Sequence, residues 1–196
     1  MQRMLLQSVE FFCLVLSLLA CISVVIAIPA FDGVTSWSSV GSLVPGISAL
    51  EALGPSSKKV DPGTLPYFMS IHAPRGLPGN MTVYRNRSPP LFYIYGDQLY
   101  HYHNDSTILP VNVYNTTGAQ DLPLQIKAGT MEDGVKGGIW RWQGTMLQYE
   151  RGTQTNQGLF YHCDDPNGLK GLFLFLQCSA PPPGCTPFTI HSWSRR

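Results

Sequence analysis

Apolar and polar residues alternate in short runs from Tyr67 toward the C-terminus, and Gly, Pro, Asn or Asp separate the runs. Such alternation predicts half-buried β-strands, and no long run keeps the 3.6-residue period of a helix. We therefore expect a single all-β domain over residues 65–196. The strands that the pattern predicts are Tyr67–His72, Met81–Tyr84, Leu91–Tyr95, Gln98–His103, Leu109–Tyr114, Leu122–Lys127, Gly138–Trp142, Thr145–Glu150, Gly158–Cys163, Gly171–Gln177 and Thr186–Trp193.

Two of the predicted hairpins share one arrangement of aromatic residues. The stretch FYIYGDQLYHY is repeated in outline by IWRWQGTMLQY. Tyr95 lies 47 positions before Trp142, and Leu99 lies 48 positions before Leu147. A repeat of this length predicts a β-trefoil-like barrel, with Gly158–Gln177 as a degenerate third copy. The alternative is a two-sheet β-sandwich.

The aromatic residues of these hairpins alternate along each strand, so every second ring faces the same side of the sheet. Trp140 and Trp142 form one such pair, and Tyr93 and Tyr95 form the other. We expect both pairs to pack the core, where large rings contribute most of the buried area of a small domain. The alternative is that Trp140 and Trp142 are exposed and stack on a sugar ring.

Residues 1–27 have the features of a signal peptide. Arg3 precedes the apolar run 11–28, and small residues near its end predict cleavage after Ala27. Because a run of about 18 apolar residues can also just span a bilayer, an uncleaved signal anchor is the alternative.

Residues 28–64 are rich in Ser, Gly and Pro, which predicts a flexible linker. Its one helix-like run is Ile47–Leu53. The dibasic pair Lys58-Lys59 would make the preceding part a propeptide if it were processed. The alternative is that both lysines are ordinary solvated residues of a loop.

Sequons for N-glycosylation follow the signal segment and agree with export. They begin at Asn80, Asn86, Asn104 and Asn115, and Pro89 directly after the second sequon makes Asn86 the weakest acceptor. The opposing interpretation is that these asparagines are simply turn residues.

Cysteine usage is consistent with the same compartment. Cys13 and Cys21 lie in the signal segment, which leaves three cysteines in the mature chain. In the hairpin that follows Leu159, Cys163 would pair near the start of the second strand, so Cys178 is too far along to bridge it. The polyproline turn before Cys185 lets the chain return, and we expect a Cys163–Cys185 disulfide with Cys178 left over.

Composition excludes some partners. Charged residues make up only 13% of the chain and the net charge is +1, so there is no basic field for nucleic acid and no polybasic patch for anionic lipid. After signal cleavage we expect no membrane association.

Candidate metal sites are weak. His101 and His103 lie on one face of a predicted strand near Asp105, but no further ligand is apparent. The segment Asp164-Asp165-Pro166-Asn167-Gly168 is rich in oxygen ligands, yet it lacks the spacing of an EF-hand and fits a hairpin turn. We expect no metal and no cofactor.

Catalytic chemistry is also weakly indicated. A glycosidase needs two carboxylates across a cleft, whereas most carboxylates here lie in turn-like contexts. The sequence has no G-x-S-x-G elbow, no H-E-x-x-H helix and no phosphate-binding glycine loop, so we expect no enzyme. The carboxylates considered are Asp97, Asp121, Glu132, Asp133, Glu150, Asp164 and Asp165.

A resemblance rests on the stretches FYIYGDQLYHY, LPVNVYNTTG, GGIWRWQGTMLQYERGTQTNQGLFYHC, GLFLF and GCTPFTIHSW, which together cover about residues 91–193. They resemble an uncharacterised family of small secreted proteins of mushroom-forming fungi. A more scattered pattern is similar to fungal cell-wall proteins of the type needed for phialide development. The resemblance implies secretion and a wall or surface role, and it carries no catalytic residues over to this chain. Cys178 departs from the family pattern.

Three function classes follow from these observations. The first is a secreted, N-glycosylated, non-catalytic protein of the cell wall or cell surface. The second is a lectin-like carbohydrate-binding module with cell-wall polysaccharide as its partner, and the third is a glycoside hydrolase. Exposure of Trp140 and Trp142 would favour the second, whereas a carboxylate pair facing a cleft would favour the third.

Overall fold

A computed structural model describes residues 46–54, 65–116, 123–164 and 168–193 of the chain, all within one compact unit over 36–196. The signal segment 1–27, its cleavage site and Lys58-Lys59 lie outside the described residues. The described part is all-β, as the sequence predicts, and its strands join in one sheet. The strands are β1 (Ala49–Leu53), β2 (Tyr67–His72), β3 (Gly79–Arg85), β4 (Leu91–Tyr95), β5 (Gln98–Asn104), β6 (Thr107–Tyr114), β7 (Leu124–Ala128), β8 (Gly138–Gln143), β9 (Met146–Arg151), β10 (Gln154–Thr155), β11 (Leu159–Asp164), β12 (Lys170–Leu174) and β13 (Cys185–Trp193).

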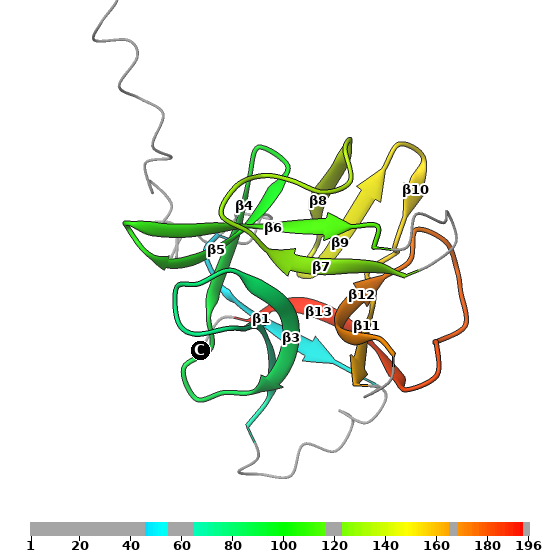
Figure 1. Ribbon diagram of the computed structural model, residues 1–196, viewed down its shortest axis with the longest axis horizontal. Coiled ribbons are helices and arrows are strands. Elements are labelled where there is room, and N and C mark those ends of the chain that lie inside the picture. Colours follow the sequence, from blue (N-terminus) through cyan, green and yellow to red (C-terminus); the bar gives the residue numbers. More distant parts are fainter. Residues whose placement is uncertain (1–45, 55–64, 117–122, 165–167, 194–196) are drawn as a thin grey trace, which may run out of the picture. The chain divides into compact units, whose positions relative to one another are not determined.

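Strand β1 corrects the predicted linker. The run Ile47–Leu53 has helix-favouring Ala, Leu and Glu, but it is not helical: all five residues of β1 pair with β13. Leu50 and Ala52, at alternate positions, are both buried. Local propensity is outweighed here because pairing with the far end of the chain buries these side chains. The all-β domain therefore includes residues 46–54, before its predicted start at 65. Figure 1 shows β1, in cyan, beside β13, in red.

Two hairpins, β4–β5 and β8–β9, repeat with a uniform offset. Ile94 pairs with Leu99, and Trp142 pairs with Leu147, so both strands of the second hairpin follow the first by 48 residues. Trp142 thus corresponds to Ile94. The predicted match with Tyr95 is wrong by one residue, and one residue reverses the face of a strand. Tyr95 is 61% exposed, against the expectation that it packs the core, whereas Tyr93 on the same face of β4 is 8% exposed and buried as expected.

The same offset continues to the C-terminal strand. Phe92, Trp140 and Phe188 lie 48 residues apart in sequence, and all three are buried. Phe188 belongs to β13, which pairs with β1. The third ring of this spacing therefore lies on the strand pair β1–β13, formed by the two ends of the described chain. Gly158–Gln177, the predicted third copy, contains a different hairpin, β11–β12.

Backbone hydrogen bonds link these three strand pairs to one another. The N–H of Phe92 donates to the carbonyl of Ser48 at 2.8 Å, and the N–H of Trp140 donates to Asp97 at 2.7 Å. The N–H of Ser192 donates to Thr145 at 2.8 Å. The three acceptors, Ser48, Asp97 and Thr145, are spaced along the sequence almost as evenly as the buried rings. One such hydrogen bond therefore occurs in each repeat.

Three further hairpins, β2–β3, β6–β7 and β11–β12, also meet. Strand β7 pairs with β3 through Gly79 and Ala128, and with β12 through Leu124 and Leu174. Strand β12 approaches β3 at Gly171, whose φ is 107° and where a Cβ would lie 2.9 Å from the carbonyl oxygen of Met81. Only glycine suits this crossing, because a side chain would be both strained and overlapped.

Candidate functional site

Trp140 and Trp142 both face the core. Trp140 is 2% exposed, and its ring lies 5.0 Å from that of Tyr149 and 6.5 Å from that of Phe160, measured between centroids. Its Nε1–H donates to the carbonyl of Val111 at 3.1 Å. Trp142 is partly buried against the same core. Core packing is therefore confirmed for Trp140, and a sugar-stacking role for this ring is excluded by its burial.

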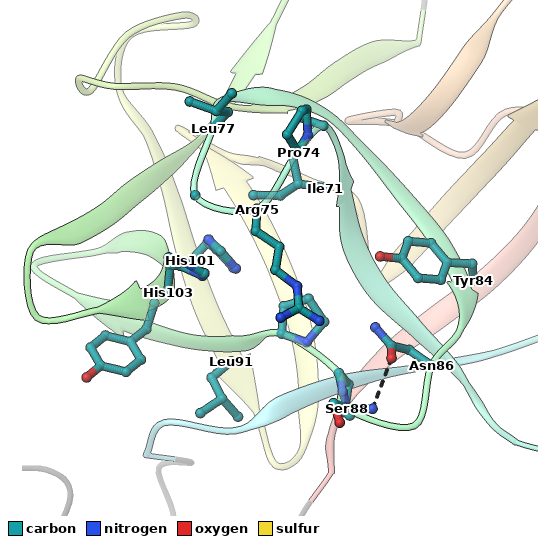
Figure 2. Close-up of a pocket in the computed structure, with 15 residues that line it drawn as sticks. Ile71, Pro74, Arg75, Leu77, Tyr84, Asn86, Ser88, Leu91, His101 and His103 are labelled. Carbon is teal, nitrogen blue, oxygen red and sulfur yellow. Dashed lines mark hydrogen bonds between the residues drawn. The ribbon is translucent and has the colours of Figure 1, made fainter.

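A cavity of about 370 Å³ lies where the loop between β2 and β3 meets β5 and the segment before β4. Figure 2 shows Arg75 extending between the two histidines on one side of this view and Tyr84, Asn86 and Ser88 on the other. The cavity is lined by Ile71, Ala73, Pro74, Arg75, Gly76, Leu77, Tyr84, Asn86, Ser88, Pro89, Pro90, Leu91, His101, Tyr102 and His103.

His101 is the buried polar side chain of the cavity wall. It is 6% exposed, and its ring lies 5.3 Å from that of Phe92 and 6.4 Å from that of His103. Burial, with a smaller contribution from His103, lowers the pKa of His101 to about 4, so the imidazole is neutral at pH 7. Its Nδ1 has no hydrogen-bond partner among the described residues. A buried polar atom left in this way costs about 1–3 kcal/mol, so its retention needs an explanation.

A tight turn presents Arg75 at the cavity. The N–H of Leu77 donates to the carbonyl of Pro74 at 3.1 Å, and Gly76 has a φ of 77°. This is the pattern of a type II turn, whose third position requires a positive φ. A Cβ on Gly76 would lie 3.1 Å from Cδ2 of His103, so glycine also lets the turn approach the histidine closely. Arg75 forms no ion pair with any residue in the described part of the chain.

The opposite wall combines an aromatic ring with polar groups. Tyr84 is 42% exposed, and the N–H of Ser88 donates to Oδ1 of Asn86 at 2.9 Å. Pro89 and Pro90 follow and limit the freedom of this wall, because each proline fixes its own φ. A ligand in the cavity would thus contact the partly exposed aromatic ring of Tyr84, hydroxyl and amide groups, and a relatively rigid backbone.

The candidate carboxylates lie elsewhere. Glu132 accepts a hydrogen bond from the hydroxyl of Tyr100, and Oδ1 of Asp133 accepts one from the N–H of Gly134. Glu150 pairs with Arg141 at 3.4 Å. None of the described carboxylates lines the cavity.

The remaining carboxylates are in turns or outside the described residues. Asp97 occupies a hairpin turn with a φ of 64°, and Asp164 ends β11. Asp121 and Asp165 lie outside the described residues, as does most of the oxygen-rich segment that begins at Asp164.

The histidine pair does not gather a metal site. Oδ1 of Asp105 accepts a hydrogen bond from the hydroxyl of Tyr102 at 2.7 Å. Across the described ranges, no group of three or more His, Cys, Asp or Glu side chains is placed to hold a metal ion.

The sequon asparagines differ in their surroundings. Asn104 and Asn115 are exposed, whereas Asn86 is partly buried in the cavity wall. Asn80 is partly buried within β3, and its Cβ lies 3.6 Å from where a Cβ on Gly171 would be. Occupancy of all four sequons stays a prediction.

The Cys163–Cys185 disulfide is confirmed. The two residues are directly opposite each other on β11 and β13. Cys163 is also opposite Gly171, at the start of β12, as the sequence argument required. Cys178 is a free, exposed cysteine.

Sequence reasoning missed Arg75 and Tyr84. The stretch APRGLPG predicts only a turn. No local sequence signal places this turn against His101 and His103, because β3 and β4 lie between them in the sequence. The pattern of His101 and His103 suggests only a metal site, and the described residues supply no group of ligands that would complete one.

No protein-family model, curated protein or solved structure matches this chain. The portion of the chain that the structure describes contains no helix with the length and hydropathy needed to cross a bilayer.

Proposed function

We propose that this chain is a secreted, N-glycosylated, non-catalytic protein of the cell wall or cell surface. The observation that carries the proposal is the Cys163–Cys185 disulfide, because such bonds persist in oxidising compartments and are rare in the cytosol. The apolar run 11–28 and the exposed sequons at Asn104 and Asn115 support export. The resemblance to small secreted proteins of mushroom-forming fungi supports the wall or surface.

Cell fractionation with N-terminal sequencing tests this proposal. Expressed in a secreting fungal host, the chain should leave the cell, start after Ala27 or after Lys59, and lose mass on enzymatic deglycosylation. A full-length chain held in the membrane fraction would instead favour the uncleaved anchor, and an unglycosylated chain in the cytosol would refute the proposal.

We further propose a β-trefoil as the architecture that carries this function. Support comes from the 48-residue spacing of Phe92, Trp140 and Phe188, and from the three hairpins that meet beside the paired strands. Amide hydrogen exchange offers a test: the N–H groups of Phe92, Trp140 and Ser192 join successive strand pairs and should be protected together. Rapid exchange at any one of them would favour the open sandwich.

A second candidate function is carbohydrate binding, and the cavity favours it. Tyr84 offers a partly exposed ring for the apolar face of a sugar, while Asn86, Ser88 and Arg75 offer polar groups for hydroxyls. This places the proposed binding site away from the tryptophans. Hydrolysis is less well supported, because none of the described carboxylates reaches the cavity.

A further inference from the structure

We propose that the cavity between the β2–β3 loop and β5 binds a sugar unit that carries one negatively charged group, and that Arg75 selects that charge. The inference rests on the carbohydrate-binding function proposed above. It narrows the ligand from saccharides in general to anionic saccharides, with a carboxylate or a sulfate as the anionic group.

The guanidinium of Arg75 carries the argument. It extends across the cavity (Figure 2) and forms no ion pair with a described residue. Because a guanidinium presents a planar fork of donors, it binds carboxylate or sulfate oxygens through two parallel hydrogen bonds. The turn that holds Arg75 is closed by the Leu77–Pro74 hydrogen bond, so the charge is presented by an ordered backbone.

The surroundings reinforce the sign of this charge. The cavity lining contains no Asp or Glu, and residues 65–103 hold three arginines and one aspartate. His101 is neutral at pH 7 because burial lowers its pKa, so it neither adds to nor opposes the charge of Arg75. An anion therefore meets a positive field with no acidic neighbour in the wall, whereas a cation would be repelled.

The remainder of the cavity suits a sugar ring. Its volume of about 370 Å³ lies at the small end of ligand pockets. Ile71 and Leu91 add apolar surface to a lining that also holds polar groups, and this mixture matches the mixed surface of a pyranose. His101 forms part of the cavity wall, and its buried Nδ1, which has no hydrogen-bond partner among the described residues, leaves a polar atom for a bridging water.

Calorimetric titration of the secreted protein tests the proposal with three trisaccharide probes. These are a galacturonate trimer, the same trimer fully methyl-esterified, and a sulfated galactose trimer. Methyl esterification removes the negative charge while keeping the ring and its hydroxyls, so it isolates the contribution of the ligand's charge. We expect the wild-type chain to bind one of the two anionic trimers at least about tenfold more tightly than the ester, the range of a charge-assisted hydrogen-bond pair. The two anionic probes identify which group the site takes.

Two variants separate a local contact from general electrostatics. Arg75→Gln should abolish the preference for the anionic trimer, while Arg151→Gln removes the same charge from the exposed end of β9 and should keep it. Arg75→Lys keeps the charge without the fork and should keep part of the preference. Melting temperatures equal to that of the wild-type chain would show that the variants are folded. We expect this result because Arg75 and Arg151 are both exposed.

Equal affinity of the wild-type chain for the ester and for both anionic trimers would overturn the proposal, as would a preference that survives Arg75→Gln, or no binding of any trimer. Binding of the chain to neutral wall polysaccharide in those cases would leave the broader function standing. Absence of binding to any polysaccharide would remove both.

Discussion

Replacing Trp140 with alanine should destabilise the fold severely. Trp140 is 2% exposed, and it packs against Tyr149 and Phe160. Truncating a buried tryptophan costs about 3–5 kcal/mol through lost burial and the cavity left behind. The hydrogen bond from Nε1 adds little to this, because the carbonyl of Val111 also accepts from Gln98 at 2.7 Å and keeps a partner. The total approaches the stability of a whole domain, about 5–15 kcal/mol.

The repeat supplies a matched control. Because Phe92 and Phe188 occupy the positions that correspond to Trp140, Trp140→Phe installs the ring that the other two copies use. We expect this variant to lose only about 1–2 kcal/mol, mainly from reduced area. Tyr95→Ala, at an exposed ring, should stay within about 0.5 kcal/mol of wild type. Urea unfolding followed by circular dichroism measures all three. An unchanged midpoint for Trp140→Ala, or equal losses for Trp140→Ala and Trp140→Phe, would refute this packing.

Three further predictions use other parts of the molecule. Since the pKa of His101 is lowered to about 4 in the folded state, the unfolded chain, with a value near 6.5, binds more protons between these limits. The free energy of unfolding should therefore fall by about 3 kcal/mol as the pH drops from about 6.5 to about 4. In His101→Leu the urea unfolding midpoint should depend less steeply on pH across this range. An equally steep dependence in that variant would contradict the assignment. Reducing the disulfide, or replacing Cys163 and Cys185 with serine, should lower the free energy of unfolding by about 3 kcal/mol, because the bond links residues 22 positions apart. Thermal unfolding measures this loss, and an unchanged melting temperature would contradict the prediction. Mass spectrometry of glycopeptides should find an N-glycan on Asn104 and none on Asn80, because a glycan on Asn80 would have to fit between β3 and β12. Full glycosylation of Asn80 would contradict this placement.

Much of the strand layout can be predicted from sequence, because alternation is a local signal. Strands β2 and β4 begin and end at the predicted residues, and the disulfide follows from the register of β11 with β12. Strand β1 could not be predicted in this way: its residues favour a helix locally, and its partner β13 lies at the other end of the chain. Non-local pairing of this kind leaves no periodic trace.

The face of each aromatic ring was harder to predict than the strand that holds it. Aligning Tyr95 with Trp142 predicts that Tyr95 lies inside, yet the observed register aligns Trp142 with Ile94, which is partly buried against the core, and Tyr95 is exposed. The cavity was less predictable still. Arg75 and His101 become neighbours only when the β2–β3 loop folds against β5, and neither residue type signals that contact.

The central claim is that this protein binds at the wall or cell surface without catalysis. Sedimentation of the secreted protein with insoluble fungal-wall polysaccharide tests this claim most directly. The account predicts saturable binding to the pellet, with no soluble sugar released during long incubation. Release of reducing sugar would show a hydrolase, and a chain that stays wholly in the supernatant would contradict wall binding.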